Sequence, residues 1–125
     1  MRKRIKFLER ELSQLIASPR LKLNKNVLAG IPKVWGLYRI FMPRSERTLY
    51  IGKSSNLRRR LRNDLLTLTG SHTLKNKLEH EWQINRENII PYLNQCRVQI
   101  ITEDQDNITT LEHFAISMLE PELND

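Results

Sequence analysis

Residues 34–52 read VWGLYRIFMPRSERTLYIG, and this stretch decides how the rest of the chain is interpreted. Aromatic and β-branched residues fill 34–41 and 48–52, which favours two strands, whereas 42–47 contains Pro and Ser and favours a turn. The two strands of such a hairpin place Tyr38 and Tyr50 side by side, and a helix start with four arginines follows directly. This pattern indicates an arrangement that handles phosphate.

Length and composition limit the possibilities further. A chain of 125 residues fits one compact domain, in which we expect 1–33 to be an N-terminal helix with a connecting segment and 34–125 to carry the function. No apolar run approaches the roughly 20 residues that span a bilayer, and acidic residues interrupt the basic start too early for a secretory signal. Cys96 is the only cysteine, which fits a reducing compartment. We therefore expect a cytoplasmic protein with no membrane partner.

The charges are divided unevenly along the chain. Residues 1–62 carry 17 Lys and Arg against 3 Asp and Glu, whereas 63–125 carry 4 against 11. Such asymmetry indicates a surface for a polyanion, and the alternative is a solvated basic face without a partner. We favour nucleic acid, because the basic residues surround the hairpin that carries the two tyrosines.

The remaining segments predict an α+β fold, a small three-stranded antiparallel sheet covered by helices with an extra N-terminal helix. We expect an amphipathic helix over 2–17, which either braces its own domain or offers a partner surface, and an irregular segment over 19–33. Further predicted elements are a helix over 57–66 capped by Ser54 to Asn56, a helix from 74 to 82, an interruption at 85–88, a strand over 96–102 and a helix over 107–119 capped by Asp106.

Glu112 lies within the apolar arc of the last predicted helix, between Ile108 and Ile116. A carboxylate at such a position requires a basic partner, hydrogen bonds or a metal, because burying it alone costs several kcal/mol. Taken by itself, a buried pair with an arginine is the simpler explanation.

Together these features resemble the GIY-YIG nuclease family over about 34–124. The first family signature is present as Gly36-Leu37-Tyr38, with Leu in place of Ile, and the second is intact as Tyr50-Ile51-Gly52. Five further positions match in order and spacing, a lysine, a helix arginine, a histidine, a glutamate and a C-terminal asparagine: Lys53, Arg60, His72, Glu112 and Asn124.

The resemblance implies hydrolysis of phosphodiester bonds. Glu112 would be the sole protein ligand of one Mg²⁺ or Mn²⁺ ion, and Arg60 would hold the scissile phosphate in its planar fork. Tyr38 would be the general base, with a pKa lowered from about 10 by Lys53, Arg60 and the metal. Tyr50 would position the water or the phosphate. Lys53 either belongs to this site or contacts backbone phosphate.

Other residues have supporting roles in this interpretation. His72 is either a catalytic residue or an ordinary residue of the loop before a helix. Asn124 would tie the C-terminal segment to the catalytic site, and Gly36 and Gly52 would allow close backbone approach.

The arginine-rich helix contributes two more expectations. Three of its arginines form a solvated or phosphate-contacting face, Arg58, Arg59 and Arg62. On a helical wheel Arg59 points away from the leucine stripe, whereas Arg60 lies at its flank, where Asp64 one turn later can orient it.

The function predicted from the sequence is a metal-dependent DNA endonuclease with a one-metal site. The alternative is a non-catalytic nucleic-acid-binding module on the same scaffold, and a third possibility is an interaction protein that uses the 2–17 helix. We expect a monomer, with a dimer through residues 2–17 as the other option.

Overall fold

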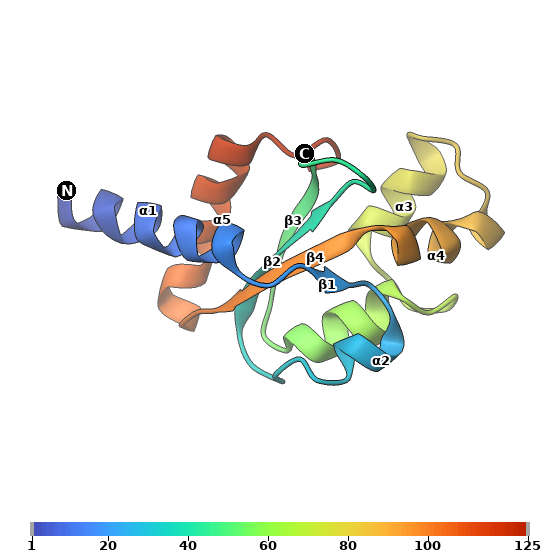
Figure 1. Ribbon diagram of the computed structural model, residues 1–125, viewed down its shortest axis with the longest axis horizontal. Helices are drawn as coiled ribbons and strands as arrows, with labels where there is room; N and C mark the ends of the chain where they lie inside the picture. Colours follow the sequence, from blue (N-terminus) through green and yellow to red (C-terminus); the bar gives the residue numbers. More distant parts are fainter. Residues whose placement is uncertain (1, 125) are drawn as a thin grey trace.

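The computed structural model describes residues 2–124 and contains one antiparallel sheet with helices on both faces (Figure 1). The predicted α+β class is confirmed, but the sheet has four strands in the order β1-β4-β2-β3 rather than three. Along the chain the elements are α1 (Arg2–Ala17), β1 (Leu21–Lys22), α2 (Lys25–Leu28), β2 (Gly36–Phe41), β3 (Thr48–Ser54), the π-helix η1 (Arg59–Leu65), α3 (Thr73–His80), α4 (Arg86–Gln95), β4 (Arg97–Thr102) and α5 (Gln105–Leu119).

The predicted hairpin is confirmed as β2 and β3. The strands pair in antiparallel register from Gly36 opposite Ser54 to Phe41 opposite Thr48, and Tyr38 is opposite Gly52. Strand β2 also pairs with β4 on its other side, so it is central in the sheet, whereas β3 is at one end of the strand order. All six residues of β2 are buried, because helices cover both of its faces.

The prediction that residues 19–33 are irregular was wrong, because they contain the fourth strand and a short helix. Leu21 pairs with Val98 of β4, and the Asn24 side chain caps α2 by accepting a hydrogen bond from the Val27 amide at 2.9 Å. A strand of two residues is too short to show an alternating pattern, so the sequence carries no periodic signal for it. Three side chains anchor the segment in the core, Leu23, Leu28 and Ile31.

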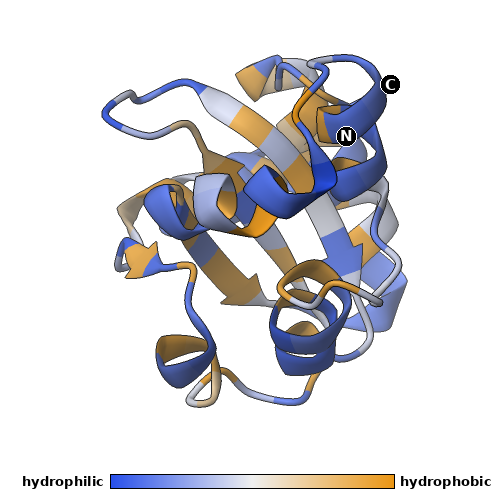
Figure 2. Ribbon diagram, turned by 90° about the vertical axis from the view of Figure 1, so that its right-hand side faces the viewer, coloured by the Kyte–Doolittle hydropathy of each residue, from blue (hydrophilic) through white to orange (hydrophobic). Residues whose placement is uncertain are grey.

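Two hydrophobic cores lie on opposite faces of the sheet. One is formed with η1, α3 and α4 and includes Tyr38, and the other is formed with α1 and α5 and includes Leu37. Figure 1 shows α1 in blue beside α5 in red, and α2 beside η1 in green. Figure 2 shows hydrophobic residues concentrated on the central strands, with hydrophilic residues on the outer sides of the helices.

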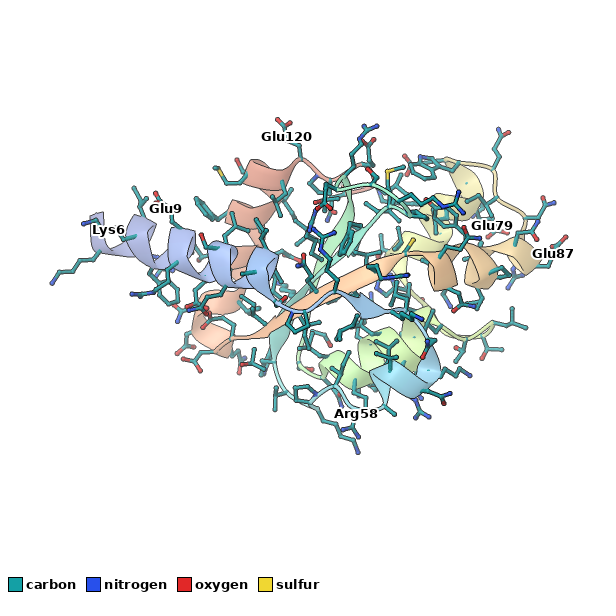
Figure 3. All side chains as sticks on the ribbon, in the orientation of Figure 1. Lys6, Glu9, Arg58, Glu79, Glu87 and Glu120 are labelled. Atoms are coloured by element: carbon teal, nitrogen blue, oxygen red, sulfur yellow. The ribbon has the colours of Figure 1, made fainter. Side chains whose placement is uncertain are left out.

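The helix predicted over 2–17 is confirmed, and it packs on its own domain. Leu8, Leu12 and Leu15 are buried against the sheet and α5, whereas Ile5 is 45% exposed and Ile16 is 42% exposed. The buried stripe is therefore narrower than predicted. The labelled Lys6 and Glu9 of this helix lie at the periphery of the molecule (Figure 3).

A buried polar network fixes the end of α1 on the sheet. Arg39 is buried, with 4% of the residue exposed. Its guanidinium donates to Thr48 Oγ1 at 2.8 Å and to Gln99 Oε1 at 2.7 Å. Gln99 in turn donates to the carbonyls of Ile16 and Ser18 at 2.7 and 2.9 Å. Every one of these buried groups has a partner, so the network links the N-terminal helix to β2 and β4.

The helices between β3 and β4 differ from prediction in detail. Residues 59–65 form a π-helix instead of the predicted α-helix. The Asn56 side chain accepts from the Arg59 amide at 3.0 Å at the start of the helical segment, which begins at Leu57, but no side chain caps the π-helix itself. Leucines at every fourth position lie on one face of either helix type, so their spacing does not distinguish them.

Two helix boundaries also differ. Residues 86–88, predicted to interrupt the helix, instead begin a separate helix, α4, with Pro91 inside it. Helix α5 begins at Gln105 after the N-cap residue Asp104, so Asp106 lies in its first turn and is not the cap. None of the helices within the described 2–124 is long and apolar enough to cross a membrane.

Candidate active site

Tyr38 lies over Gly52, its cross-strand partner. A Cβ atom at Gly52 would overlap Cζ and Oη of Tyr38, so the absence of a side chain makes room for the phenol ring. Tyr50 lies on the same face of the hairpin, with ring centroids 6.3 Å apart. Gly36 is equally confined, because a Cβ there would overlap the Leu57 side chain and approach the Ile101 carbonyl oxygen.

Gly52→Ala is expected to lower the free energy of unfolding by about 1–3 kcal/mol, since the new methyl group must displace the Tyr38 ring. Chemical denaturation measures this loss. Gly30→Ala is the matched control, because a Cβ at Gly30 meets only the Val27 carbonyl at 3.6 Å. Equal stability of the two variants would show that Tyr38 does not occupy this space.

His72 connects Tyr38 to the start of α3. Its ring is 1% exposed, Nδ1 accepts a hydrogen bond from the Leu74 amide at 3.0 Å, and Nε2 lies 2.7 Å from Tyr38 Oη. Because an amide can only donate, Nδ1 carries no proton, and the proton of the neutral ring is on Nε2. Burial lowers the pKa of His72 to about 3, with the charges of Arg60 and Lys75 adding to the effect. The neutral imidazole therefore donates its hydrogen bond to the Tyr38 oxygen.

Of the three cations expected to lower the pKa of Tyr38, Arg60 acts in that direction. Burial raises this pKa well above 10, and the proximity of Tyr50 adds to the increase, whereas Arg60 opposes it without overcoming it. Lys53 does not contribute, because it follows Gly52 in the strand and its side chain lies on the opposite face of the sheet. Tyr38 is consequently a neutral phenol at pH 7.

Arg60 projects from η1 toward the two tyrosines and is held by two acceptors. Its Nη1 donates to the Ser71 carbonyl at 3.0 Å and to Asp64 Oδ2 at 3.3 Å, and the guanidinium also lies within donating reach of Tyr38. Asp64 thus occupies the orienting position expected for it. The guanidinium is oriented by neighbouring groups before any phosphate arrives.

Glu112 faces a pocket of about 390 Å³ at the β3 edge of the sheet. Its carboxylate accepts no hydrogen bond from the described residues, and its nearest cation is Lys53 Nζ at 3.9 Å, which also donates to Thr109 at 2.7 Å. Burial raises the pKa of Glu112, while Lys53 and His113 oppose the increase. The pocket is lined by residues of β3, α3, α5 and the C-terminal segment, Tyr50, Thr73, Lys77, Glu112, His113, Ile116, Ser117 and Asn124.

The side chains around the pocket suit some cations better than others. Within residues 2–124, no three His, Cys, Asp or Glu side chains are grouped as a closed metal centre requires, which disfavours a structural zinc site. A single carboxylate beside an open pocket suits Mg²⁺, which retains several waters and takes one or two carboxylates. The Glu112 carboxylate, whose one ion-pair contact with a described residue is Lys53 at 3.9 Å, is therefore compatible with one Mg²⁺ or Mn²⁺.

Asn124 forms paired hydrogen bonds with the backbone of the edge strand. Its Oδ1 accepts from the Ile51 amide and its Nδ2 donates to the Ile51 carbonyl, both at 2.8 Å. The amides of Glu122 and Leu123 add bonds to Thr48 and Leu49, so the C-terminal segment covers the outer edge of β3. Since Asn124 uses its amide on the peptide between Tyr50 and Gly52, its contacts are those of a positioning residue.

The other arginines of η1 have different surroundings. Arg58 donates through Nε to the Ile31 carbonyl at 2.6 Å, and Arg62 donates through Nε to the Lys25 carbonyl at 3.2 Å. Both side chains therefore help to hold the segment 25–31 against η1. Arg59 is exposed and Arg60 faces the tyrosines, as the helical wheel predicted.

Two pocket residues were not predicted from the sequence. Thr73 lines the pocket beside Tyr50, and Lys77 lies one turn further along α3 on the same side of the pocket. Burial raises the pKa of Tyr50, whereas Thr73, Arg60 and Lys77 oppose the increase. The spacing of His72, Thr73 and Lys77 on one helix was the available signal, since residues four apart share a face.

Two tyrosines, an oriented arginine and a carboxylate therefore lie around the antiparallel hairpin. The family model described as the GIY-YIG catalytic domain matches residues 34–121, so the chain belongs to the GIY-YIG family. No curated protein and no solved structure gives a significant match to the chain.

Proposed function

We propose that the protein is a divalent-metal-dependent DNA endonuclease that hydrolyses phosphodiester bonds with one Mg²⁺ or Mn²⁺ per site. The observation that carries this proposal is the Glu112 carboxylate, which faces a pocket shared with Tyr50 and has no close hydrogen-bond donor among the described residues. A bound cation would polarise a phosphate oxygen and stabilise the charge that develops on it. The runner-up is a nucleic-acid-binding module without turnover.

The protein's own groups divide the remaining work. Arg60 donates to a non-bridging oxygen of the scissile phosphate, for which its contacts with Ser71 and Asp64 have already oriented it. Tyr38, as phenolate, accepts a proton from the attacking water as the water oxygen bonds to phosphorus. The bond from phosphorus to the leaving oxygen breaks, and solvent water protonates that oxygen. Two donors, His72 Nε2–H and Arg60, stabilise the phenolate that this step requires.

Incubation of supercoiled plasmid with Mg²⁺, beside a sample containing EDTA, tests the proposal. We expect cleavage only with the metal. Nicked circles should form before linear DNA, because one domain offers one site and the buried stripe of α1 is already used within its own domain. DNA binding without any metal-dependent cleavage would instead support the runner-up. Linear DNA without a nicked intermediate, from a stable dimer in sedimentation, would contradict the monomer.

The pH dependence tests the roles of Tyr38 and His72. Since the pKa of Tyr38 is raised, only a small fraction is phenolate at neutral pH, and the cleavage rate should increase about tenfold per pH unit above pH 6. His72→Asn keeps an N-cap side chain for α3 but removes the donor to Tyr38. Losing a hydrogen bond to the charged form raises the pKa of Tyr38 further, so the variant should cleave about 10- to 100-fold more slowly at each pH in this range.

The pH profile of the cleavage rate also tells whether His72 acts as a donor to Tyr38 or has only a structural role. His72→Gln, whose longer amide can restore a donor, should recover part of the rate. A wild-type rate in His72→Asn, or a rate that does not depend on pH, would contradict the donor role. Circular dichroism confirms that both variants are folded.

A further inference from the structure

An open groove of about 780 Å³ lies at the turn end of the β2–β3 hairpin, apart from the pocket of Glu112. Strand β2 passes from Tyr38 to Phe41 over three residues, so the groove begins about 10 Å along the strand from Tyr38, and Phe41 lies on the opposite face of the sheet. It is lined by residues around β1, the hairpin turn, the end of α4 and the start of β4: Arg20, Lys22, Phe41, Met42, Pro43, Arg44, Ser45, Glu46, Asn94, Gln95 and Arg97.

Three of the four positive charges of the groove have no carboxylate partner within the described chain. Lys22 is directly opposite Arg97 in the sheet, and like charges in this position destabilise strand pairing. The groove has one carboxylate, Glu46, and Arg20 already binds both of its oxygens. No ion pair joins Lys22, Arg44 or Arg97 to a carboxylate within residues 2–124. A polyanion would relieve this repulsion.

Arg44 is held in an uncommon backbone conformation at the hairpin turn. Its φ of 57° lies in the left-handed region, where glycine and asparagine are the usual residues. The turn is nevertheless ordered by hydrogen bonds from the Ser45 amide to the Met42 carbonyl at 3.3 Å and from the Met42 amide to the Arg47 carbonyl at 2.9 Å. A strained arginine in a position that suits glycine points to a use for its side chain.

We propose that this groove binds the DNA backbone beside the cleavage site, with Lys22, Arg44 and Arg97 contacting phosphates. The inference rests on the proposed function for the choice of DNA as the polyanion. The Ser45 hydroxyl and the Asn94 and Gln95 amides add groups that commonly contact phosphate and sugar.

The groove offers no ring for bases to stack on. Phe41 is buried, and the guanidinium groups of Arg20 and Arg39 lie 4.9 and 4.6 Å from its ring centroid. Contacts of this kind position the duplex without reading its sequence. The groove therefore supplies affinity and orientation to a site that has one oriented arginine for the scissile phosphate.

The test compares the salt dependence of DNA binding in EDTA, measured by fluorescence anisotropy with a short labelled duplex. The variant Lys22→Gln/Arg44→Asn/Arg97→Gln removes three groove charges, and Lys3→Gln/Lys6→Gln/Arg10→Gln removes three from the exposed side of α1. Figure 3 shows Lys6 at the opposite end of the molecule from α4. We expect the log–log salt slope to fall by about 2–3 in the groove variant and by less than about one in the α1 variant.

Arg44→Gly separates binding from folding. Glycine adopts a positive φ without strain, so this variant should melt no lower than the wild type while its salt slope falls by about one. A second duplex with the same composition and a scrambled sequence should give the same slopes.

An unchanged slope in the groove variant, equal losses in the two triple variants, or losses confined to one DNA sequence would each overturn the inference. The experiments distinguish a failure of the proposed endonuclease activity from a failure of the groove proposal. If the wild type does not cleave plasmid but the salt slope of DNA binding still falls in the groove variant, the groove proposal is supported and the endonuclease proposal is refuted. If the wild type cleaves plasmid and the groove variant keeps the wild-type salt slope, only the groove proposal is refuted.

Discussion

Glu112→Gln is expected to cleave plasmid DNA at least about 1,000-fold more slowly than the wild type, which corresponds to about 4 kcal/mol of lost transition-state stabilisation. Glutamine keeps the size of the side chain but cannot supply the negative charge that a divalent cation requires. DNA binding should change little, since most of the affinity comes from basic residues elsewhere on the surface. A plasmid time course with Mg²⁺ measures the rate, and anisotropy in EDTA measures the binding.

Asp106→Asn is the matched control, because Asp106 is an exposed carboxylate on the same helix and does not line the pocket. It removes the same charge and should leave the cleavage rate within about twofold of the wild type. Circular dichroism of both variants separates a loss of chemistry from a loss of fold. Near wild-type cleavage by Glu112→Gln would mean that another group holds the metal, or that the reaction does not depend on this carboxylate.

The hairpin was predictable because its signals are local. Two runs of strand-forming residues flank a Pro- and Ser-containing turn, and the period of two in a strand places Tyr38, Tyr50 and Gly52 on one face. The same rule assigns Lys53 to the opposite face, so its separation from Tyr38 was already implicit in the sequence. The proximity of Lys53 to Glu112 depends on how α5 packs, which the sequence alone does not specify.

The features that were missed depend on tertiary contacts. Strand β1 exists because Leu21 and Lys22 pair with β4, and a strand of two residues has no pattern of its own. The pKa of Tyr38 is raised because the residue is buried beneath α3 and η1. The basic residues that follow Tyr50 in the sequence suggested a lowered pKa, and they carry no information about this burial. The proton position on His72 follows one backbone contact, the Leu74 amide.

The proposed active site combines groups from both faces of the sheet at the edge of β3. Tyr38 and His72 belong to the face covered by η1 and α3, whereas Glu112 and Lys53 belong to the face covered by α5. Asn124 binds the backbone of Ile51 in β3, the edge strand that separates these two groups of residues. The position of β3 therefore sets the distance between the two groups. The C-terminal segment is therefore in direct contact with the strand that carries the second signature.

Arg60→Ala is expected to reduce turnover by about 10³-fold or more at saturating DNA, in line with the effect of arginines that stabilise charge on a transferring phosphoryl group. The side chain is already held by Ser71 and Asp64, so the wild type loses little freedom when the phosphate binds. The reduction should appear in the rate at saturation rather than in the affinity. Single-turnover cleavage with excess enzyme measures it directly.

Arg59→Ala is the matched variant, one residue away on the exposed side of η1. It should leave single-turnover cleavage nearly unchanged and lower the salt slope of binding by about one. Arg60→Lys retains a positive charge but not the planar fork, so its rate should lie between those of Arg60→Ala and the wild type. If Arg59→Ala and Arg60→Ala reduce turnover equally, the π-helix does not present Arg60 to the phosphate, and the charge of the whole helix, rather than one oriented guanidinium, assists the reaction.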